Sequence, residues 1–170
     1  FVSGRSAEVC YLDPPYSSHQ YGSNYFMLNT ILRWDRPPVS DERDDDGNLL
    51  LKAGIRPDWV ATRSSFCSAK SALAALKAFL GRVDVRTIVV SYSSAGIIAI
   101  PQLIDALAER GEPSLHVSEY TAYRGGRQSM TRSTRADEYV VVVDCGKSGG
   151  RRGRARIDRR LAEYEVAALA

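Results

Sequence analysis

Several kinds of segment are missing from this chain of 170 residues. No apolar run reaches the roughly 18 residues of a membrane-spanning helix, and the first residues show no charged segment followed by an apolar segment and a cleavage site. Cysteine is scarce, and Cys10, Cys67 and Cys145 are odd in number and form no C-x-x-C motif. These absences exclude a disulfide framework and a zinc knuckle, and they favour a reducing, cytoplasmic location.

An initiator methionine is also absent, and the chain enters an apolar segment almost at once. We therefore expect it to be the C-terminal part of a longer protein. Histidine is rare, and His19 and His116 lie far apart without other ligand types beside them, so we expect no metal site. The length allows one core, which predicts a single domain or a piece of a larger one.

Positive charge is concentrated near the C-terminus, although the net charge is only +3. Residues 146–160 read GKSGGRRGRARIDRR and contain a single acid, Asp158. Clustered basic side chains attract nucleic-acid phosphates. The candidate phosphate contacts are Arg151, Arg152, Arg154 and Arg156. A disordered, solubilising tail explains the same composition equally well, so both interpretations stay open.

Strand-like and helix-like segments alternate along the chain. Apolar and β-branched runs predict strands at 8–12, 85–96, 114–123 and 138–145. Amphipathic spacing predicts helices at 24–34, 68–81, 100–111 and 159–170. Residues 35–59, rich in proline, glycine and acid, are expected to form a long surface loop. This order predicts an α/β sheet, mostly parallel and covered on both faces, in which the last two strands pair antiparallel at one side.

The stretch YLDPPYSSHQYGSNYF, residues 11–26, begins where the first predicted strand ends, and sheets of this class carry their sites at strand ends. Pro14 and Pro15 have no N–H and a fixed φ, so the backbone offers only carbonyl acceptors in a stiff direction. Asp13 adds a carboxylate acceptor, and Tyr16 adds a flat face. These groups suit a planar ligand whose exocyclic amine is held through both N–H groups. Asp-Pro-Pro alone would serve equally as a strand-ending turn.

At these residues the chain resembles the adenine-N6 DNA methyltransferases of the D-P-P-Y type. YLDPPYSSHQYGSNYFMLNTI looks like that family's D-P-P-Y, Gln-Tyr and Asn-Tyr signals and the helix that follows. VVSYSSAGII looks like its Ser-Tyr-Asn strand end, and Glu-Tyr opens the last predicted strand in a similar way. The resemblance covers about residues 8–145 in consistent order. Such an ordered set is far more specific than Pro-Pro-Tyr alone.

The resemblance implies a Rossmann-like sheet that uses S-adenosylmethionine, incomplete at its N-terminus, over residues 1–145, followed by a basic tail with a short helix at 146–170. It also implies methyl transfer to a flipped adenine of double-stranded DNA, with a cognate restriction endonuclease as a partner. The implied catalytic residues are Asp13, Pro14, Pro15 and Tyr16. The implied base contacts are Tyr16, Tyr21, Tyr25 and Tyr92, and the implied cofactor contacts are Asp13 and Ser91. Tyr21 and Tyr25 suit loop packing equally well.

The chain departs from the family's pattern in two places. The family's Ser-Tyr-Asn followed by Glu-Gly is replaced by SYSSAG at 91–96, and the glycine-rich F-x-G-x-G segment, the family's main cofactor site, does not occur. Truncation explains this second absence more simply than divergence. Two other functions stay open. One is methyl transfer to RNA or to a protein amide, against which Asp13 counts because many such enzymes have Asn there. The other is a non-catalytic nucleic-acid-binding fragment.

Overall fold

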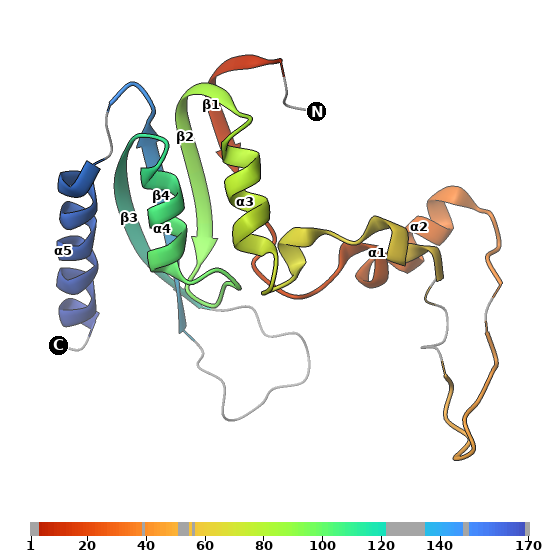
Figure 1. Ribbon diagram of the computed structural model, residues 1–170. Helices are drawn as coiled ribbons and strands as arrows, with labels where there is room; N and C mark the ends of the chain where they lie inside the picture. Colours follow the sequence, from red (N-terminus) through yellow and green to blue (C-terminus); the bar gives the residue numbers. More distant parts are fainter. Residues whose placement is uncertain are drawn as a thin grey trace.

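The computed structural model describes residues 4–38, 40–50, 55, 57–121, 135–147 and 150–168 (Figure 1). Along the chain the elements are β1 (Ser6–Leu12), α1 (Tyr21–Asn24), α2 (Phe26–Arg33), the 3-10 helices η1 (Pro57–Thr62) and η2 (Ser65–Cys67), α3 (Ala72–Leu80), β2 (Asp84–Ser93), α4 (Ile100–Ala108), β3 (Glu112–Thr121), β4 (Arg135–Asp144) and α5 (Gly150–Ala168). The four strands and the helices α2, α3 and α4 overlap the segments predicted for them.

The described strands form one mixed sheet in the order β1-β2-β4-β3. β1 and β2 are parallel, whereas β4 runs antiparallel to both of its neighbours. The prediction of a mostly parallel sheet is therefore wrong for these pairings. The cause is the place of β4: it reverses direction after β3 and enters between β2 and β3, so a single reversed strand makes two antiparallel pairings. The predicted antiparallel pairing of the last two strands is confirmed.

Side chains along each strand point alternately to the two faces of the sheet, and one of these faces is covered. On β2, Ile88, Val90 and Tyr92 point to this face and are almost fully buried. The β4 side chains that the register places opposite them are also buried: Val143, Val141 and Tyr139. Helices α3, α4 and α5 form one layer over this face, since α4 contacts both of the others, and Figure 1 shows α3 and α4 in front of the sheet with α5 beyond β3.

The opposite face is more open within the described residues. Val9 and Tyr11 of the edge strand β1 point to it and are 57% and 62% exposed. On this face Val89 of β2 and Val142 of β4 are only partly buried, although Ser91 and Ser93 near the end of β2 are buried. The prediction that helices cover both faces is thus not met by the helices that the structure describes.

Helices α1 and α2 lie with η1 on one side of the sheet (Figure 1). α2 begins at Phe26 and ends at Arg33, with Trp34 in the left-handed conformation as its C-cap. Tyr25 is its N-cap, and it makes no side-chain capping bond. The side chains of α2 stay largely open, and Leu32 is 84% exposed. This group positions the chain that follows β1 without adding to the main core.

The basic C-terminal run is helical rather than a disordered tail. α5 begins at Gly150, well before the predicted helix start at 159. Ile157 is 1% exposed and belongs to the main core, and Gly153 lies close against Pro113 at the start of β3. The helix predicted at 159–170 is thus the second half of α5, and its first turns were missed because arginine and glycine dominate them.

Two further observations concern the described part of the chain as a whole. None of its helices combines the length and the apolar character needed to cross a membrane. All three cysteines are free thiols, and burial raises the pKa of Cys10.

Candidate functional site

The Asp-Pro-Pro-Tyr segment follows β1 directly and is held in irregular, extended backbone. Asp13 is exposed, and within the described residues its carboxylate makes no hydrogen bond or ion pair, so both oxygens can accept. Together with Pro14 and Pro15 it borders an open, mostly apolar hollow of about 210 Å³. The other side of the hollow is formed by Phe66, Leu76 and Phe79. An acceptor-rich rim beside an apolar floor suits a flat ring that carries an amine.

Tyr16 is supported from behind by Tyr92 at the end of β2. The two rings meet edge to face, with centroids 6.1 Å apart and an interplanar angle of 86°. Tyr16 is 42% exposed, whereas Tyr92 is only 1% exposed. Both residues were predicted from sequence as base contacts, but Tyr92 has no open face to offer a ligand. Its contact can fix the orientation of the Tyr16 ring.

Backbone hydrogen bonds join the loop after β2 to the same pair. The N–H of Ile98 donates to the Tyr92 hydroxyl at 2.9 Å, and the N–H of Ile97 donates to the Tyr16 carbonyl at 3.0 Å. Burial raises the pKa of Tyr92, and backbone hydrogen bonds from Ile98 and Ile97 partly oppose this rise. A β-carbon at Gly96 would collide with the Tyr92 ring. Glycine at this position therefore lets the loop close over the ring.

The same loop is also anchored to β4. The N–H of Ser94 donates to the Asp137 carbonyl at 2.8 Å, and the N–H of Asp137 donates to the Ser94 hydroxyl oxygen at 3.0 Å. Nearby, the buried Ser91 hydroxyl donates to the carboxylate of Glu138 at 3.0 Å. Ser91, a predicted cofactor contact, thus already has an acceptor on the neighbouring strand.

The other two predicted base contacts form a separate ring pair. Tyr21 and Tyr25 lie 5.6 Å apart between centroids and are each about half exposed. Just before them, the Gln20 side chain accepts the N–H of Ser64 at 2.8 Å and donates to its carbonyl at 3.2 Å. These two hydrogen bonds tie the segment after Tyr16 to the start of η2. A base-binding role for Tyr21 and Tyr25 stays a prediction.

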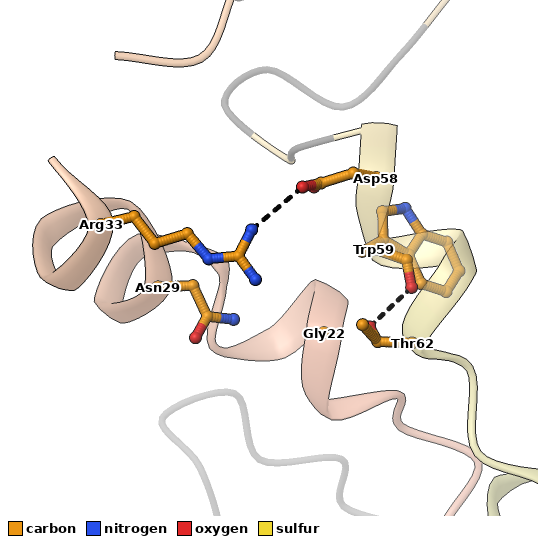
Figure 2. A pocket seen from close by; sticks show the side chains of 6 residues that line it. All are labelled: Gly22, Asn29, Arg33, Asp58, Trp59 and Thr62. Atoms are coloured by element: carbon orange, nitrogen blue, oxygen red, sulfur yellow. Dashed lines mark hydrogen bonds and ion pairs between the residues drawn. The ribbon is translucent and has the colours of Figure 1, made fainter. Parts of the chain in front are cut away.

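A smaller hollow of about 30 Å³ lies between α1, α2 and η1 (Figure 2). Arg33 of α2 and Asp58 of η1 form an ion pair of 3.2 Å beside it, and the Thr62 hydroxyl donates to the Trp59 carbonyl at 2.8 Å. A volume of this size holds about one water molecule. These contacts therefore fasten α2 to η1 rather than build a ligand site.

Comparison with known proteins bears on the D-P-P-Y segment directly. Residues 2–42 match the model of the D12 class N6 adenine-specific DNA methyltransferases. This chain is a relative of the D12 class methyltransferases. The prediction made from the D-P-P-Y and Ser-Tyr segments is thereby confirmed.

Curated relatives extend the similarity to most of this chain's length. The chain is 29% identical over 146 residues to the type II methyltransferase M.NlaIII of Neisseria lactamica, covering 84% of this chain and 40% of the relative. It is 32% identical over 137 residues to the type II methyltransferase M.FokI of Planomicrobium okeanokoites, covering 80% of this chain and 20% of the relative. The chain therefore spans less than half the length of these relatives. No solved structure matches it significantly.

The predicted phosphate contacts of this D12 relative have different surroundings. Arg154 forms ion pairs with Asp105 of α4 and Asp158 of α5, and it donates to the Pro101 carbonyl at 2.9 Å. Only 26% of its side chain is exposed, so it links two helices. Arg156 pairs with Glu112 of β3 at 3.2 Å. The side chains of Arg151 and Arg152 lie outside the description.

Some residues around the site were missed by sequence reasoning. Leu76 and Phe79 face the hollow beside Asp13, although their helical spacing indicated only a core face. Gly96 belongs to the SYSSAG segment at 91–96, but nothing in that segment alone shows that the Tyr92 ring packs against it. Among the described residues, no group of three or more His, Cys, Asp and Glu could hold a metal ion.

Proposed function

We propose that this chain carries the base-binding part of a Rossmann-like DNA adenine-N6 methyltransferase. The observation that carries the proposal is the rim of Asp13, Pro14 and Pro15: it lies at the end of β1, borders an open hollow, is followed directly by Tyr16, and falls inside the segment that matches the D12 model. The strand directions support the fold class, because β1, β2 and β3 share one direction and β4 alone is reversed. Residues 1–145 would form the C-terminal part of the catalytic domain, and 146–170 an added segment whose helix packs on it.

The proposed chemistry depends on the acceptors of the rim. The N6 amine of adenine is a poor nucleophile because its lone pair is delocalised into the ring. The Asp13 carboxylate accepts one of its N–H groups and the Pro14 carbonyl the other, which favours a pyramidal nitrogen with an available lone pair. Tyr16 stacks on the flipped base, a contact worth about 1–3 kcal/mol in single-strand binding sites. Tyr92 and the loop over it hold the Tyr16 ring in place.

The methyl donor that we propose is S-adenosylmethionine, which supplies an electrophilic methyl group when bound. The described residues fit it only in part, because the hollow of about 210 Å³ is smaller than the roughly 300–1,000 Å³ of ordinary ligand pockets. The chain also has no F-x-G-x-G segment. We therefore assign to these residues one wall of a cofactor site, at Asp13 and Ser91.

Double-stranded DNA is the proposed substrate, and a cognate restriction endonuclease is a proposed partner. Other relatives carry names that suit such a system: "Modification methylase StsI" of Streptococcus sanguinis and "Modification methylase LlaI" of Lactococcus lactis subsp. lactis. Identity to these two is 30% and 27%, over 14% and 21% of their lengths.

The function is tested with the natural gene product that contains these residues, expressed in cells that lack adenine methylation. Mass spectrometry of digested genomic DNA should show N6-methyladenine, and tritium transfer from labelled S-adenosylmethionine should confirm it in vitro. Asp13→Ala should abolish both signals while DNA binding persists, because only the amine acceptor is lost. His19→Ala, an exposed residue of the same loop, is the matched control and should keep activity.

Two results would count against this function. Methylation that persists near the wild-type level in Asp13→Ala would remove the carboxylate from the mechanism. Methylated RNA or a methylated protein amide, without N6-methyladenine in DNA, would replace the substrate.

A further inference from the structure

A second hollow, of about 330 Å³, lies between β3 and α5. Its walls are mainly basic: α5 contributes Arg156, Arg159 and Arg160, and β3 contributes His116. Among the described residues that line it, Glu163 is the one acid. Three guanidinium groups against one carboxylate leave the hollow with an excess of positive charge. It differs in this respect from the apolar hollow beside Asp13.

The residues that line this basic hollow belong to the strand β3 and the helix α5. Ile157 and Leu115, 1% and 3% exposed, close its floor and belong to the main core. Arg156 is held in place because its guanidinium donates to the Pro113 carbonyl at 3.3 Å and pairs with Glu112 at 3.2 Å. The close approach of Gly153 to Pro113 brings α5 tightly against β3. The arrangement of the basic side chains therefore does not depend on a mobile loop.

Two of the guanidinium groups are available to a ligand. Arg159 and Arg160 are exposed, and within the described residues neither forms an ion pair or a side-chain hydrogen bond. A guanidinium presents a planar fork of donors that matches the oxygens of a phosphate group. Arg154 lies about one and a half turns earlier in α5 and is different, since its donors are already used by Asp105 and Asp158.

The strand register relates this hollow to the D-P-P-Y site. Leu12 pairs with Val90, Val90 with Val141, and Val141 with Leu115. Leu115 in the floor of the basic hollow is therefore in the same row of the sheet as the last residue of β1. Three strand spacings separate the two, about 15 Å at the usual distance between neighbouring strands. One extended polyanion can thus reach both places.

We propose that the basic hollow between β3 and α5 binds backbone phosphates of double-stranded DNA, as a contact separate from the base-binding rim. The choice of DNA as the partner rests on the proposed function. The binding itself requires neither methyl transfer nor the cofactor, so it can be tested, and can fail, independently of catalysis. Of the arginines predicted from sequence as phosphate contacts, Arg156 lines this surface and Arg154 does not, while the side chains of Arg151 and Arg152 lie outside the description.

The test measures binding of the 170-residue chain to a fluorescently labelled DNA duplex of arbitrary sequence, by anisotropy over a range of salt concentrations. The double variant Arg159→Gln, Arg160→Gln should bind about tenfold more weakly at low salt, and its plot of log affinity against log salt should be flatter by about 1.8, since each lost phosphate contact removes about 0.9. Arg159→Lys, Arg160→Lys keeps the charge and should recover much of the affinity.

The matched control is Arg82→Gln, Arg86→Gln, which removes the same charge from exposed residues near the start of β2. Circular dichroism should confirm that all variants are folded. Equal losses of affinity and slope in the control and in the Arg159, Arg160 variant would overturn the proposal, because binding would then follow net charge alone. Tighter binding to an RNA duplex of the same sequence, with the same dependence on Arg159 and Arg160, would overturn the choice of DNA.

Discussion

Support of the Tyr16 ring depends on a few neighbouring residues that do not themselves face the hollow beside Asp13. Tyr92 holds the ring edge to face, and its buried hydroxyl accepts the N–H of Ile98. This arrangement is possible because position 96 has no side chain. Tyr92 thus affects the site by orienting Tyr16, and Gly96 affects it by leaving room for the Tyr92 ring.

Gly96→Ala should therefore destabilise the protein. The new methyl group would overlap the Tyr92 ring, whose 1% exposure leaves it little room to move, and overpacking of this kind costs about 1–3 kcal/mol. Urea unfolding followed by circular dichroism measures the change in free energy. Gly81→Ala is the control: its β-carbon would lie at an ordinary 3.5 Å from the Lys77 carbonyl oxygen, so stability should be unchanged or slightly higher. An unchanged midpoint for Gly96→Ala would contradict the proposed close packing.

At the scale of elements, α5 is an integral part of the fold. It packs on β3 and α4, and Ile157 joins the main core. Arg154 adds polar contacts to α4, since it pairs with Asp105 and donates to the Pro101 carbonyl. One stretch of arginines therefore contains a residue used for packing and others that are open to solvent.

Arg154→Ala should loosen α5 from α4. The loss of a hydrogen bond to a carbonyl and of two ion pairs with exposed carboxylates should lower the free energy of unfolding by about 1 kcal/mol. Hydrogen exchange of α5 amides should become faster, while exchange in β2 stays close to the wild-type rate. Arg160→Ala, on the same helix, has no such contacts among the described residues and should leave both measurements unchanged. Equal protection of α5 in the two variants would show that the apolar contacts alone hold the helix.

At the scale of the whole molecule, the described sheet is enclosed unevenly. Helices cover one face, while Val9 and Tyr11 of the edge strand β1 are largely exposed on the other. The hollow beside Asp13 is correspondingly open and small. Enclosure and fixed dipoles are what a site needs to hold a small charged ligand.

We expect these 170 residues alone to show no measurable binding of S-adenosylmethionine and no methyl transfer. Isothermal titration calorimetry with the cofactor, at protein concentrations in the micromolar range, tests the first expectation directly. A clear micromolar dissociation constant would mean that residues other than a glycine-rich F-x-G-x-G segment complete the site.

The sequence by itself determined the features that depend on local chemistry. Alternating and β-branched runs placed the four strands to within a few residues, and helical spacing located α3 and α4. The D-P-P-Y segment and its position after β1 were likewise apparent, because proline and aspartate act on the backbone of their own segment. The same local signals identified the family.

Only the tertiary structure decided the features that depend on residues far apart in the chain. The insertion of β4 between β2 and β3 is set by pairings such as Tyr92 with Tyr139, and no short stretch of sequence encodes them. Burial of Tyr92 follows from the same packing. Arg154 and Arg160 are the same residue type in one helix, yet Arg154 meets Asp105 across the helix interface and Arg160 faces the basic hollow. Their surroundings differ because the helical repeat places them on different sides of α5, and the packing of α5 against β3 and α4 decides what each side meets.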